Sequence, residues 1–540
     1  MNDTPVNELP VWHRLTAHAE EMNLPENHLL HLTTSPLRLK KSLKLGAGVL
    51  LDFSRQRVTD ITVDLLLELA EHRRVQERFR SMMAGEKINV TEKRAALHTA
   101  ARCFQEEPVT VDGVNVVPEL QAVREGIRAF AAKVHDGELR GSTGKAFRHV
   151  VVVGIGGSYL GTEFVSCALR AYADRGIALH YLANVDIHNF GRVVSEIDPE
   201  STLWVIISKS YTTAETLANA RLAYDFMERH GLNPTDHVVT VTAKGSPGDN
   251  ADNPVLGTFH MFDFIGGRYS VTSAVGGVPL SLYLGYDRFE AMLRGAEAMD
   301  RHAAEAPAAD NLPLIAALLS VWNNNFLGYP AAGIIPYAAP LARLAPHVQQ
   351  LNMESNGKSV TASGRPLQIP AGTILFGEPG TNAQHSFFQL AHQGRPFPIE
   401  FIGVLQPQYT EYHTLSRGVT NHQELWANLL AQADALAHGR EAEDPARSFS
   451  GNRPSSTIVL KDLSPESVGR LLAFYEAKTV FEAFVWGINP FDQFGVELGK
   501  KTASGIREEM AEKNRNPAYG FDKTDDRTRH YLLALYDGDM

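Results

Sequence analysis

HVVVVGIGGS, from His149 to Ser158, is an apolar run that ends in a glycine-rich turn. A second stretch of the same kind follows, because LWVII (Leu203 to Ile207) leads into SKSYTTAET (Ser208 to Thr216). Each apolar run has the length of a buried strand, and each turn opens a segment that favours a helix. The sequence therefore predicts parallel βαβ units, with both turns at the carboxyl ends of their strands.

Both turns have the composition of a phosphate-binding site. Backbone N–H groups and the positive end of the helix dipole attract anions at a helix start, and Ser and Thr hydroxyls add donors. A capping box formed by Thr212 and Glu215 explains two polar residues of the second turn as an ordinary helix start. It leaves four further residues of that turn without a role: Ser208, Lys209, Ser210 and Thr213. We therefore expect a phosphorylated small molecule as the ligand.

Two nucleotide-binding motifs fit this chain poorly. The dinucleotide pattern G-x-G-x-x-G requires a third glycine where the chain has Tyr159, and no Gly-Lys-Ser/Thr follows at the spacing of a P-loop. A tight strand-to-helix turn without any ligand is the simple alternative for GIGGS taken alone. The second hydroxyl-rich turn is what favours phosphate binding.

Composition limits the kind of protein. The chain has 540 residues, 44% of them hydrophobic, and a formal net charge of −11, which argues against general binding to nucleic acid or anionic membranes. Cys103 and Cys167 are the only cysteines, so we expect neither a disulfide framework nor a thiolate metal site. We see no secretory signal at the N-terminus and no apolar stretch near the ~20 residues of a membrane span. These features predict a cytoplasmic protein.

The fold class that we predict is α/β, with two doubly wound parallel-sheet domains flanked by helices. Residues 1–115 form a helical N-terminal region that packs on the larger domain, with amphipathic periodicity from Thr62 to Met83. Strands alternate with helices in residues 116–290, the first domain, and again in residues 291–505, the second. Residues 506–540 are predicted to form a charged C-terminal arm.

Four residues outside the phosphate turns have side chains suited to proton transfer. Arg268 follows two glycines in DFIGGRYS and offers a permanent positive charge. Glu354 lies between an apolar helix and an Asn-Gly turn, and an ionised glutamate can act as a base. His385 follows a Gly/Asn-rich loop, and histidine is the natural proton shuttle near neutral pH. Lys500, next to Gly499, is interpreted as part of a turn near a cleft.

Each of these residues also has an ordinary structural explanation, such as a surface salt bridge, a solvated carboxylate or a capping histidine. His392, seven residues after His385, is interpreted as structural. Taken together, the set contains no nucleophile with an activating partner and no His/Cys/Asp metal cluster. It suits proton transfer next to a carbonyl.

Several strings of this chain resemble the glucose-6-phosphate isomerase family. They occur in that family's order over residues 85–500, and they are GEKINVTEKRAALHTAAR, GIGGSYLG, SKSYTTAET, DFIGGRYS, QQLNMESNGK, GTNAQHSFFQLAHQG and FDQFGVELGK. Small departures occur at Ser210, Tyr211 and Ala483, and none removes a group that the chemistry needs.

The resemblance implies two sugar-isomerase (SIS) domains, a homodimer, and reversible interconversion of glucose 6-phosphate and fructose 6-phosphate in glycolysis and gluconeogenesis, without cofactor or metal. It places the phosphate at Ser158, Ser208, Lys209, Ser210 and Thr213. It places the sugar at Gly156, Gly157, Gly267 and Gln350. The implied catalytic residues are Arg268, Glu354, His385 and Lys500, with His385 reaching the site of the neighbouring subunit.

The same resemblance implies the role of each catalytic residue. His385, helped by Lys500, opens the sugar ring, and Glu354 carries a proton between C2 and C1 through a cis-enediol. Two alternatives share the phosphate turns. One is a sensor module that binds sugar phosphate without chemistry. The other is an isomerase that makes glucosamine 6-phosphate, but that enzyme normally carries an N-terminal cysteine nucleophile, which this chain lacks.

Overall fold

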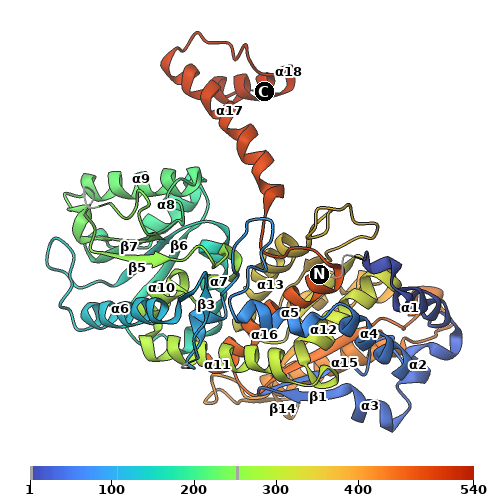
Figure 1. Ribbon diagram of the computed structural model, residues 1–540. Helices are drawn as coiled ribbons and strands as arrows, with labels where there is room; N and C mark the ends of the chain where they lie inside the picture. Colours follow the sequence, from blue (N-terminus) through green and yellow to red (C-terminus); the bar gives the residue numbers. More distant parts are fainter. Residues whose placement is uncertain (1–3, 106, 251–253, 540) are drawn as a thin grey trace. The chain divides into compact units, whose positions relative to one another are not determined.

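The computed structural model describes residues 4–105, 107–250 and 254–539, and the chain forms two compact units, Met1–Pro490 and Phe491–Met540. The first unit contains two sheets with helices around them, so the predicted α/β class is confirmed (Figure 1). The second unit is helical. The limits that we predicted for the individual domains stay predictions.

The first sheet has five parallel strands in the order β6-β5-β7-β8-β9. Their bounds are β5 His149–Val153, β6 Ala178–Leu182, β7 Thr202–Ile207, β8 Val238–Ala243 and β9 Gly257–Met261. The chain leaves β5 in one direction to reach β6 and then returns past β5 to β7, so the strand order reverses between β5 and β7. A crevice at such a switch point is where doubly wound sheets bind ligands.

Helices cover both faces of the first sheet. Helices α8 (Ile187–Ser195) and α9 (Ala214–Arg229) lie on one face, and α6 (Val117–His135) and α10 (Ala274–Leu284) lie on the other (Figure 1). Buried aliphatic and aromatic side chains of the strands pack against α8 and α9 in one continuous core that includes Trp204. Since both faces are covered, the central strands are apolar almost throughout, as parallel strands usually are.

The second sheet has six strands in the order β1-β2-β15-β12-β10-β11. Their bounds are β1 Leu43–Gly46, β2 Val49–Asp52, β10 Ala331–Pro336, β11 Ile374–Phe376, β12 Ile399–Val404 and β15 Ser455–Leu460. The last four are mutually parallel, whereas β1 and β2 add to the edge as an antiparallel hairpin. We predicted helices for this N-terminal region, so the hairpin is a correction. Its two-residue turn, Ala47–Gly48, has positive φ at both residues, as tight hairpins require.

The remaining elements are mostly helices. In the first unit they are α1 Pro10–Glu21, α2 Leu29–Leu32, α3 Pro36–Ser42, α4 Asp60–His72, α5 Val75–Met83, α7 Leu160–Ala168, α11 Tyr286–Glu305, α12 Leu312–Val321, α13 Leu344–Val348, α14 Phe388–Gln393, α15 Asn421–His438 and α16 Pro465–Trp486, with the short hairpins β3 Thr110–Val111 with β4 Val114–Asn115 and β13 Leu415–Ser416 with β14 Val419–Thr420. The amphipathic stretch from Thr62 to Met83 is two helices rather than one, because Arg74 between them has left-handed backbone, φ 52°.

The second unit consists of α17 (Glu497–Arg515) and α18 (Asp526–Asp537), and the ring centroids of Phe521 and Tyr536 lie 5.5 Å apart where its end folds back. Lys500 is an exposed residue inside α17. The turn that we predicted at Gly499 and Lys500 is therefore wrong, because the helix continues through both residues. Among the described residues, none of the helices combines the length and the apolar character needed to cross a bilayer.

Helix α16 is buried along almost its whole length, and it crosses α11 at two glycines. A Cβ atom on Gly469 would lie 1.9 Å from the carbonyl oxygen of Met292, and one on Gly295 would lie 2.0 Å from that of Glu466. Real side chains do not approach backbone so closely, so glycine at both positions sets the distance between the helices. This crossing holds α16, whose polar side chains support the candidate site described below.

We expect Gly469→Ala to lower the free energy of unfolding by about 1–3 kcal/mol, because the added methyl group forces α11 and α16 apart. The matched control is Gly191→Ala in α8, where nothing lies within 4 Å of the added Cβ. That change should be neutral or stabilising by about 0.5–1 kcal/mol, the usual preference of a helix for alanine. Urea unfolding followed by circular dichroism compares the two variants. Equal effects of the two changes would contradict the packing argument.

Candidate active site

The glycine-rich turn after β5 lies at the switch point of the first sheet. Gly156–Ser158 forms one turn of 3-10 helix, and α7 starts directly after it. Gly156 has φ +57°, a left-handed conformation that glycine adopts without strain. Ser158 is half-buried just before the helix start, so its hydroxyl and nearby backbone N–H groups lie where anions are favoured.

A second glycine turn, Gly267–Tyr269, touches the first one through backbone atoms. A Cβ atom on Gly157 would lie 2.2 Å from the carbonyl carbon of Gly267 and 2.4 Å from its oxygen. The hydroxyl of Ser270 joins the two turns, since it donates to the oxygen of Gly267 at 2.6 Å and to that of Gly157 at 3.3 Å. This contact fixes the next residue, Arg268, beside the phosphate turn.

The second predicted phosphate turn follows β7, the neighbouring strand in the sheet. Ser208 is buried, and its hydroxyl has no hydrogen-bond partner in the described part of the chain. Lys209 donates from Nζ to the carbonyl oxygen of Asp263 at 3.0 Å, and burial lowers the pKa of this lysine against the opposing effect of the Asp263 carboxylate. The pair of turns therefore combines a buried donor with a positive charge.

The capping box that we predicted at this turn is wrong. Helix α9 starts at Ala214 with Thr213 as its N-cap, and the Thr213 side chain makes no capping hydrogen bond. The hydroxyls of Thr212 and Ser210 pair with each other at 2.7 Å instead. Because no box forms, the Thr213 hydroxyl is not committed to the helix start, which agrees better with a ligand-binding role for this turn than with an ordinary cap.

Arg268 and Glu354 form the charged pair of the site. Arg268 is 3% exposed, and its Nη1 lies 3.6 Å from Oε1 of Glu354, whose side chain is 18% exposed. Its Nε donates to Oγ of Ser355 at 2.7 Å, and its Nη2 donates to the carbonyl oxygen of Pro490 at 2.7 Å. The guanidinium is therefore held in one orientation, with a charged face toward the carboxylate.

Glu354 ends a π-helix, Gln349–Glu354, that continues α13. Such helices are rare and occur mostly at functional sites. Gln350 of this segment reaches the first turn, since its Nε2 lies 3.0 Å from the place of a Cβ on Gly156. Sequence reasoning predicted the residues of this cluster, and the structure brings together Gly156, Gly157, Gly267, Arg268, Gln350 and Glu354.

Helix α16 supports the π-helix through buried polar side chains. Asn352 and Asn356 donate to Oε2 of Glu482 at 2.5 and 2.9 Å. Lys478 balances the charge, because its Nζ lies 3.2 Å from Oε1 of Glu482 and 3.1 Å from Oε1 of Glu400. Buried charges need such partners. Sequence reasoning missed these residues and Ser355. The ESNG string is a local signal for Ser355 and Asn356, but nothing local indicates Glu482.

The structure does not bring His385 to this cluster within one chain. His385 ends a 3-10 helix, Asn382–His385, and is exposed, and in the described chain no hydrogen bond or ion pair joins its side chain to the other candidate residues. His392 belongs to a different helix, α14, and its Nε2 lies 2.8 Å from Oε1 of Gln432, as a structural residue would. Lys500 belongs to the second unit, Phe491–Met540.

Metal binding finds no support in the described residues, where no group of three or more His, Cys, Asp or Glu side chains could hold an ion.

The cluster combines two turns suited to anion binding with the Glu354 carboxylate and the fixed Arg268 guanidinium. Fold and site thus define the class of doubly wound α/β proteins with a glycine-rich turn and a charged Arg–Glu pair near the switch point. The profile of the phosphoglucose isomerase family matches residues 52–526, and the chain belongs to this family.

Individual relatives agree with the family assignment. The chain is 65% identical over 539 residues to a glucose-6-phosphate isomerase of Desulfosudis oleivorans, with 99% of each chain covered. It is 43% identical over 540 residues to the cytosolic A glucose-6-phosphate isomerase of Oryza sativa subsp. japonica, covering 95% of this chain and 94% of the relative. A crystal structure of a glucose-6-phosphate isomerase from Chlamydia trachomatis superposes with a TM-score of 0.89, 36% identity and 99% coverage of both chains.

We expect Gly157→Ala to weaken binding of fructose 6-phosphate by about tenfold or more, a loss of ~1.4 kcal/mol. The methyl group cannot fit against Gly267, so the phosphate turn and Arg268 must separate. Isothermal titration calorimetry measures the effect, and Gly191→Ala is again the control with open space at its Cβ. Unchanged affinity in Gly157→Ala would show that the contact between the turns does not position the ligand.

Proposed function

We propose that this protein catalyses the reversible isomerisation of glucose 6-phosphate and fructose 6-phosphate. The observation that carries the proposal is the Glu354 carboxylate, 3.6 Å from the buried Arg268 guanidinium and next to the glycine turn of the first sheet. Membership in the phosphoglucose isomerase family and the 65% identical relative support it. A base beside a fixed positive charge suits proton transfer at a carbon next to a carbonyl.

The phosphate group of the substrate binds at the two turns of the first sheet. The unpartnered hydroxyl of Ser208 and the positive charge of Lys209 support this placement, together with Ser158, Ser210 and Thr213 at the starts of α7 and α9. Binding energy gained at the phosphate holds the sugar in place and contributes to lowering the barrier of the remote chemical step.

Glu354 acts as the single base of the isomerisation. It takes the proton from C2 of the open-chain aldose and returns it to C1, while a proton moves from O2 to O1. The cis-enediol between these steps is planar, so one carboxylate on one face reaches both carbons. Arg268 stabilises the negative charge that develops on the oxygens, and its three fixed contacts keep it preorganised for that task.

His385 and Lys500 open the sugar ring before the proton transfer. The exposure of His385, and its lack of hydrogen bonds and ion pairs to the cluster in the described chain, support a role in the site of a second subunit. We therefore include a homodimer in the proposal, in which each active site takes His385 from the partner. The cytoplasm is the proposed location, as for the relatives with cytosolic names.

The proposed domain division follows the two sheets. Residues 116–290 and 291–505 form two SIS domains, residues 1–115 pack on the larger one, and residues 506–540 form an arm. The first sheet lies wholly within residues 116–290, which supports the first limit. The β1–β2 hairpin joins the second sheet, which supports packing of the N-terminal region on that domain.

We expect Glu354→Gln to lower kcat by on the order of 10²–10⁴, the usual effect of removing a general base. Affinity for the sugar phosphate should stay within a few-fold of that of the unmodified protein, because the phosphate turns are unchanged. The assay follows fructose 6-phosphate consumption, with glucose 6-phosphate formation coupled to NADP reduction. Glu443→Gln, at an exposed loop position, is the matched control.

Two results of this assay would contradict the proposal. Turnover in Glu354→Gln above a tenth of the unmodified rate would remove Glu354 from the role of base. Fructose 6-phosphate binding by the unmodified protein without turnover would favour the sensor alternative.

A mixing experiment tests the shared active site. Glu354→Gln and His385→Ala should each be inactive alone, but mixed dimers regain one intact site. After subunit exchange about half of the dimers are mixed, so activity should return to about a quarter of that of the unmodified protein, as two-fold symmetry requires. If His385 acts within its own chain, every site in the mixture lacks one group and no activity returns.

A further inference from the structure

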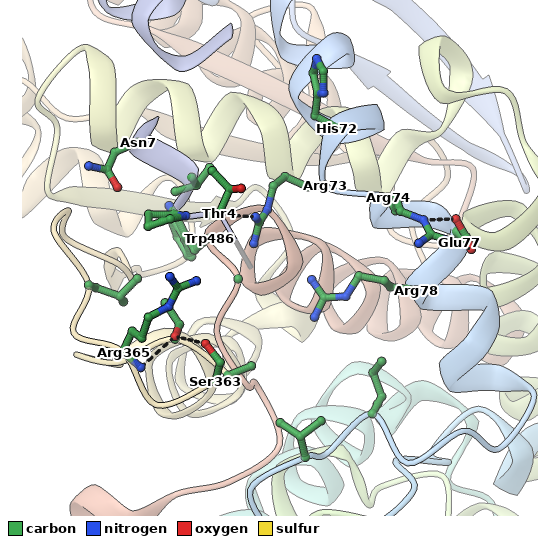
Figure 2. Close-up of a pocket in the computed structure, with 18 of the residues that line it drawn as sticks. Thr4, Asn7, His72, Arg73, Arg74, Glu77, Arg78, Ser363, Arg365 and Trp486 are labelled. Carbon is green, nitrogen blue, oxygen red and sulfur yellow. Dashed lines mark hydrogen bonds and ion pairs between the residues drawn. The ribbon is translucent and has the colours of Figure 1, made fainter. Parts of the chain in front are cut away.

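A cavity of the first unit has a volume of about 580 Å³ and is lined by none of the candidate active-site residues (Figure 2). Four segments form its walls. They are residues 4–7, the break between α4 and α5 with the chain that follows, the loop 361–368, and the end of α16 at Trp486 and Gly487. This volume lies in the usual range for sites that bind small molecules.

The charge of this cavity is opposite to that of the chain. Five arginines and lysines line it against two glutamates, although the formal net charge of the whole chain is −11. The positive residues are Arg73, Arg74, Arg78, Lys87 and Arg365. Arg74 pairs with Glu77, and Lys87 lies 2.7 Å from Asp112. A positive pocket on an acidic protein is a local feature that selects anions.

The break between α4 and α5 directs the guanidinium groups into the cavity. Arg74 has left-handed backbone there, and α5 starts after it without a side-chain cap. The side chains of Arg73 and Arg78 extend from the α4–α5 wall, and that of Arg365 extends from the loop 361–368, toward the same space (Figure 2).

Arg78 is held rigidly beside a second positive charge. Its Nη1 donates to the carbonyl oxygen of Phe484 at 3.1 Å, and its guanidinium carbon lies 4.0 Å from the centre of the Phe484 ring. Its Nε is buried without a hydrogen-bond partner in the described part of the chain. Burial, and then the charge of Arg73, lower the pKa of Arg78 to about 10. An anion between the two arginines would relieve this repulsion.

We propose that this cavity is a second anion site, which binds a small molecule with two or more phosphate groups. Arginine matches phosphate oxygens with parallel N–H donors, and convergent arginines from separate segments suit a ligand with more than one phosphate. The site is distinct from the phosphate turns of the first sheet. The proposal does not depend on isomerase activity, because it concerns binding alone.

The cavity is connected to the active site through two of its walls. The backbone N–H of Ala362 donates to the carbonyl oxygen of Gly487 at 2.8 Å, so the loop 361–368 and the end of α16 are joined. Three residues after Gly487, the carbonyl oxygen of Pro490 accepts the hydrogen bond from Arg268. The loop itself follows the segment that carries Glu354. A ligand in the cavity thus contacts two segments that lead directly to the catalytic pair.

The test is calorimetric titration of the full-length protein with inorganic pyrophosphate, in the presence of saturating fructose 6-phosphate to occupy the active site. We expect about one pyrophosphate to bind per chain under these conditions. Arg365→Gln, at an exposed loop position, should weaken this binding by about tenfold, the effect of losing one charge-assisted contact. Arg447→Gln, whose side chain is 76% exposed on another loop, is the matched control and should change nothing.

A variant that is expected to raise the affinity for pyrophosphate distinguishes a loss of binding contacts from general damage to the fold. Glu77→Gln removes the carboxylate that pairs with Arg74, so it should strengthen pyrophosphate binding several-fold. Citrate, a carboxylate of similar charge, should bind at least tenfold more weakly than pyrophosphate.

Four results would overturn the proposal. They are loss of pyrophosphate binding once fructose 6-phosphate is present, unchanged affinity in Arg365→Gln, weaker binding in Glu77→Gln, and equal binding of citrate. If fructose 6-phosphate itself fails to bind, the proposed isomerase function is wrong. The pyrophosphate affinities of Arg365→Gln, Glu77→Gln and the control Arg447→Gln still test whether the cavity binds phosphate.

Discussion

The backbone contact between Gly157 and Gly267 is the constraint on which the candidate site depends. It joins the turn after β5 to the turn that carries Arg268, without a side chain between them. The two turns belong to different segments, about a hundred residues apart in the sequence, and one carries the proposed phosphate site while the other carries Arg268. Because the two turns touch through main-chain atoms, the distance between them is set by the two glycines, together with the hydrogen bonds that Ser270 donates to both turns.

A second set of constraints comes from α16, whose buried charged side chains contact the segment that carries Glu354. Glu482 accepts from the two asparagines of the Glu354 segment and is neutralised by Lys478. Earlier in the same helix, Glu476 lies 2.5 Å from the buried Arg102, and burial raises the pKa of Glu476 to about 7 against the opposing effect of that arginine. Buried ion pairs of this kind add little net stability, but a buried charge without its partner is strongly destabilising. The pairs therefore favour the one arrangement of α16 in which every buried charge has its partner.

Much of this architecture could be predicted from the sequence. The apolar runs before GIGGS and SKSYTTAET identified the strands on both sides of the switch point, because buried parallel strands are apolar throughout. The β1–β2 hairpin was missed because it is short and its edge pairing depends on β15, more than 400 residues away.

The candidate site could be predicted only in part. Its glycines, Arg268 and Glu354 stand in distinctive local strings, and these strings also carry the family resemblance. The capping box at Thr212 failed because a local pattern cannot show whether hydroxyls pair with the backbone or with each other. Glu482 and Pro490 act through the tertiary structure alone, so neither is marked by its sequence neighbours.

The π-helix at Gln349–Glu354 has a consequence for how this segment can change in length. A π-turn contains one residue more than an α-helix of the same course. Because the extra residue is taken up locally, deleting one residue of the π-turn would restore regular α-helical hydrogen bonds and leave the later residues on their present faces. Deleting one residue from the regular helix α13 before it would instead rotate every later side chain by about 100° around the axis. Glu354 would then point away from Arg268, even though its residue type had been kept. The phase of the helix, and not only its composition, is therefore part of the site.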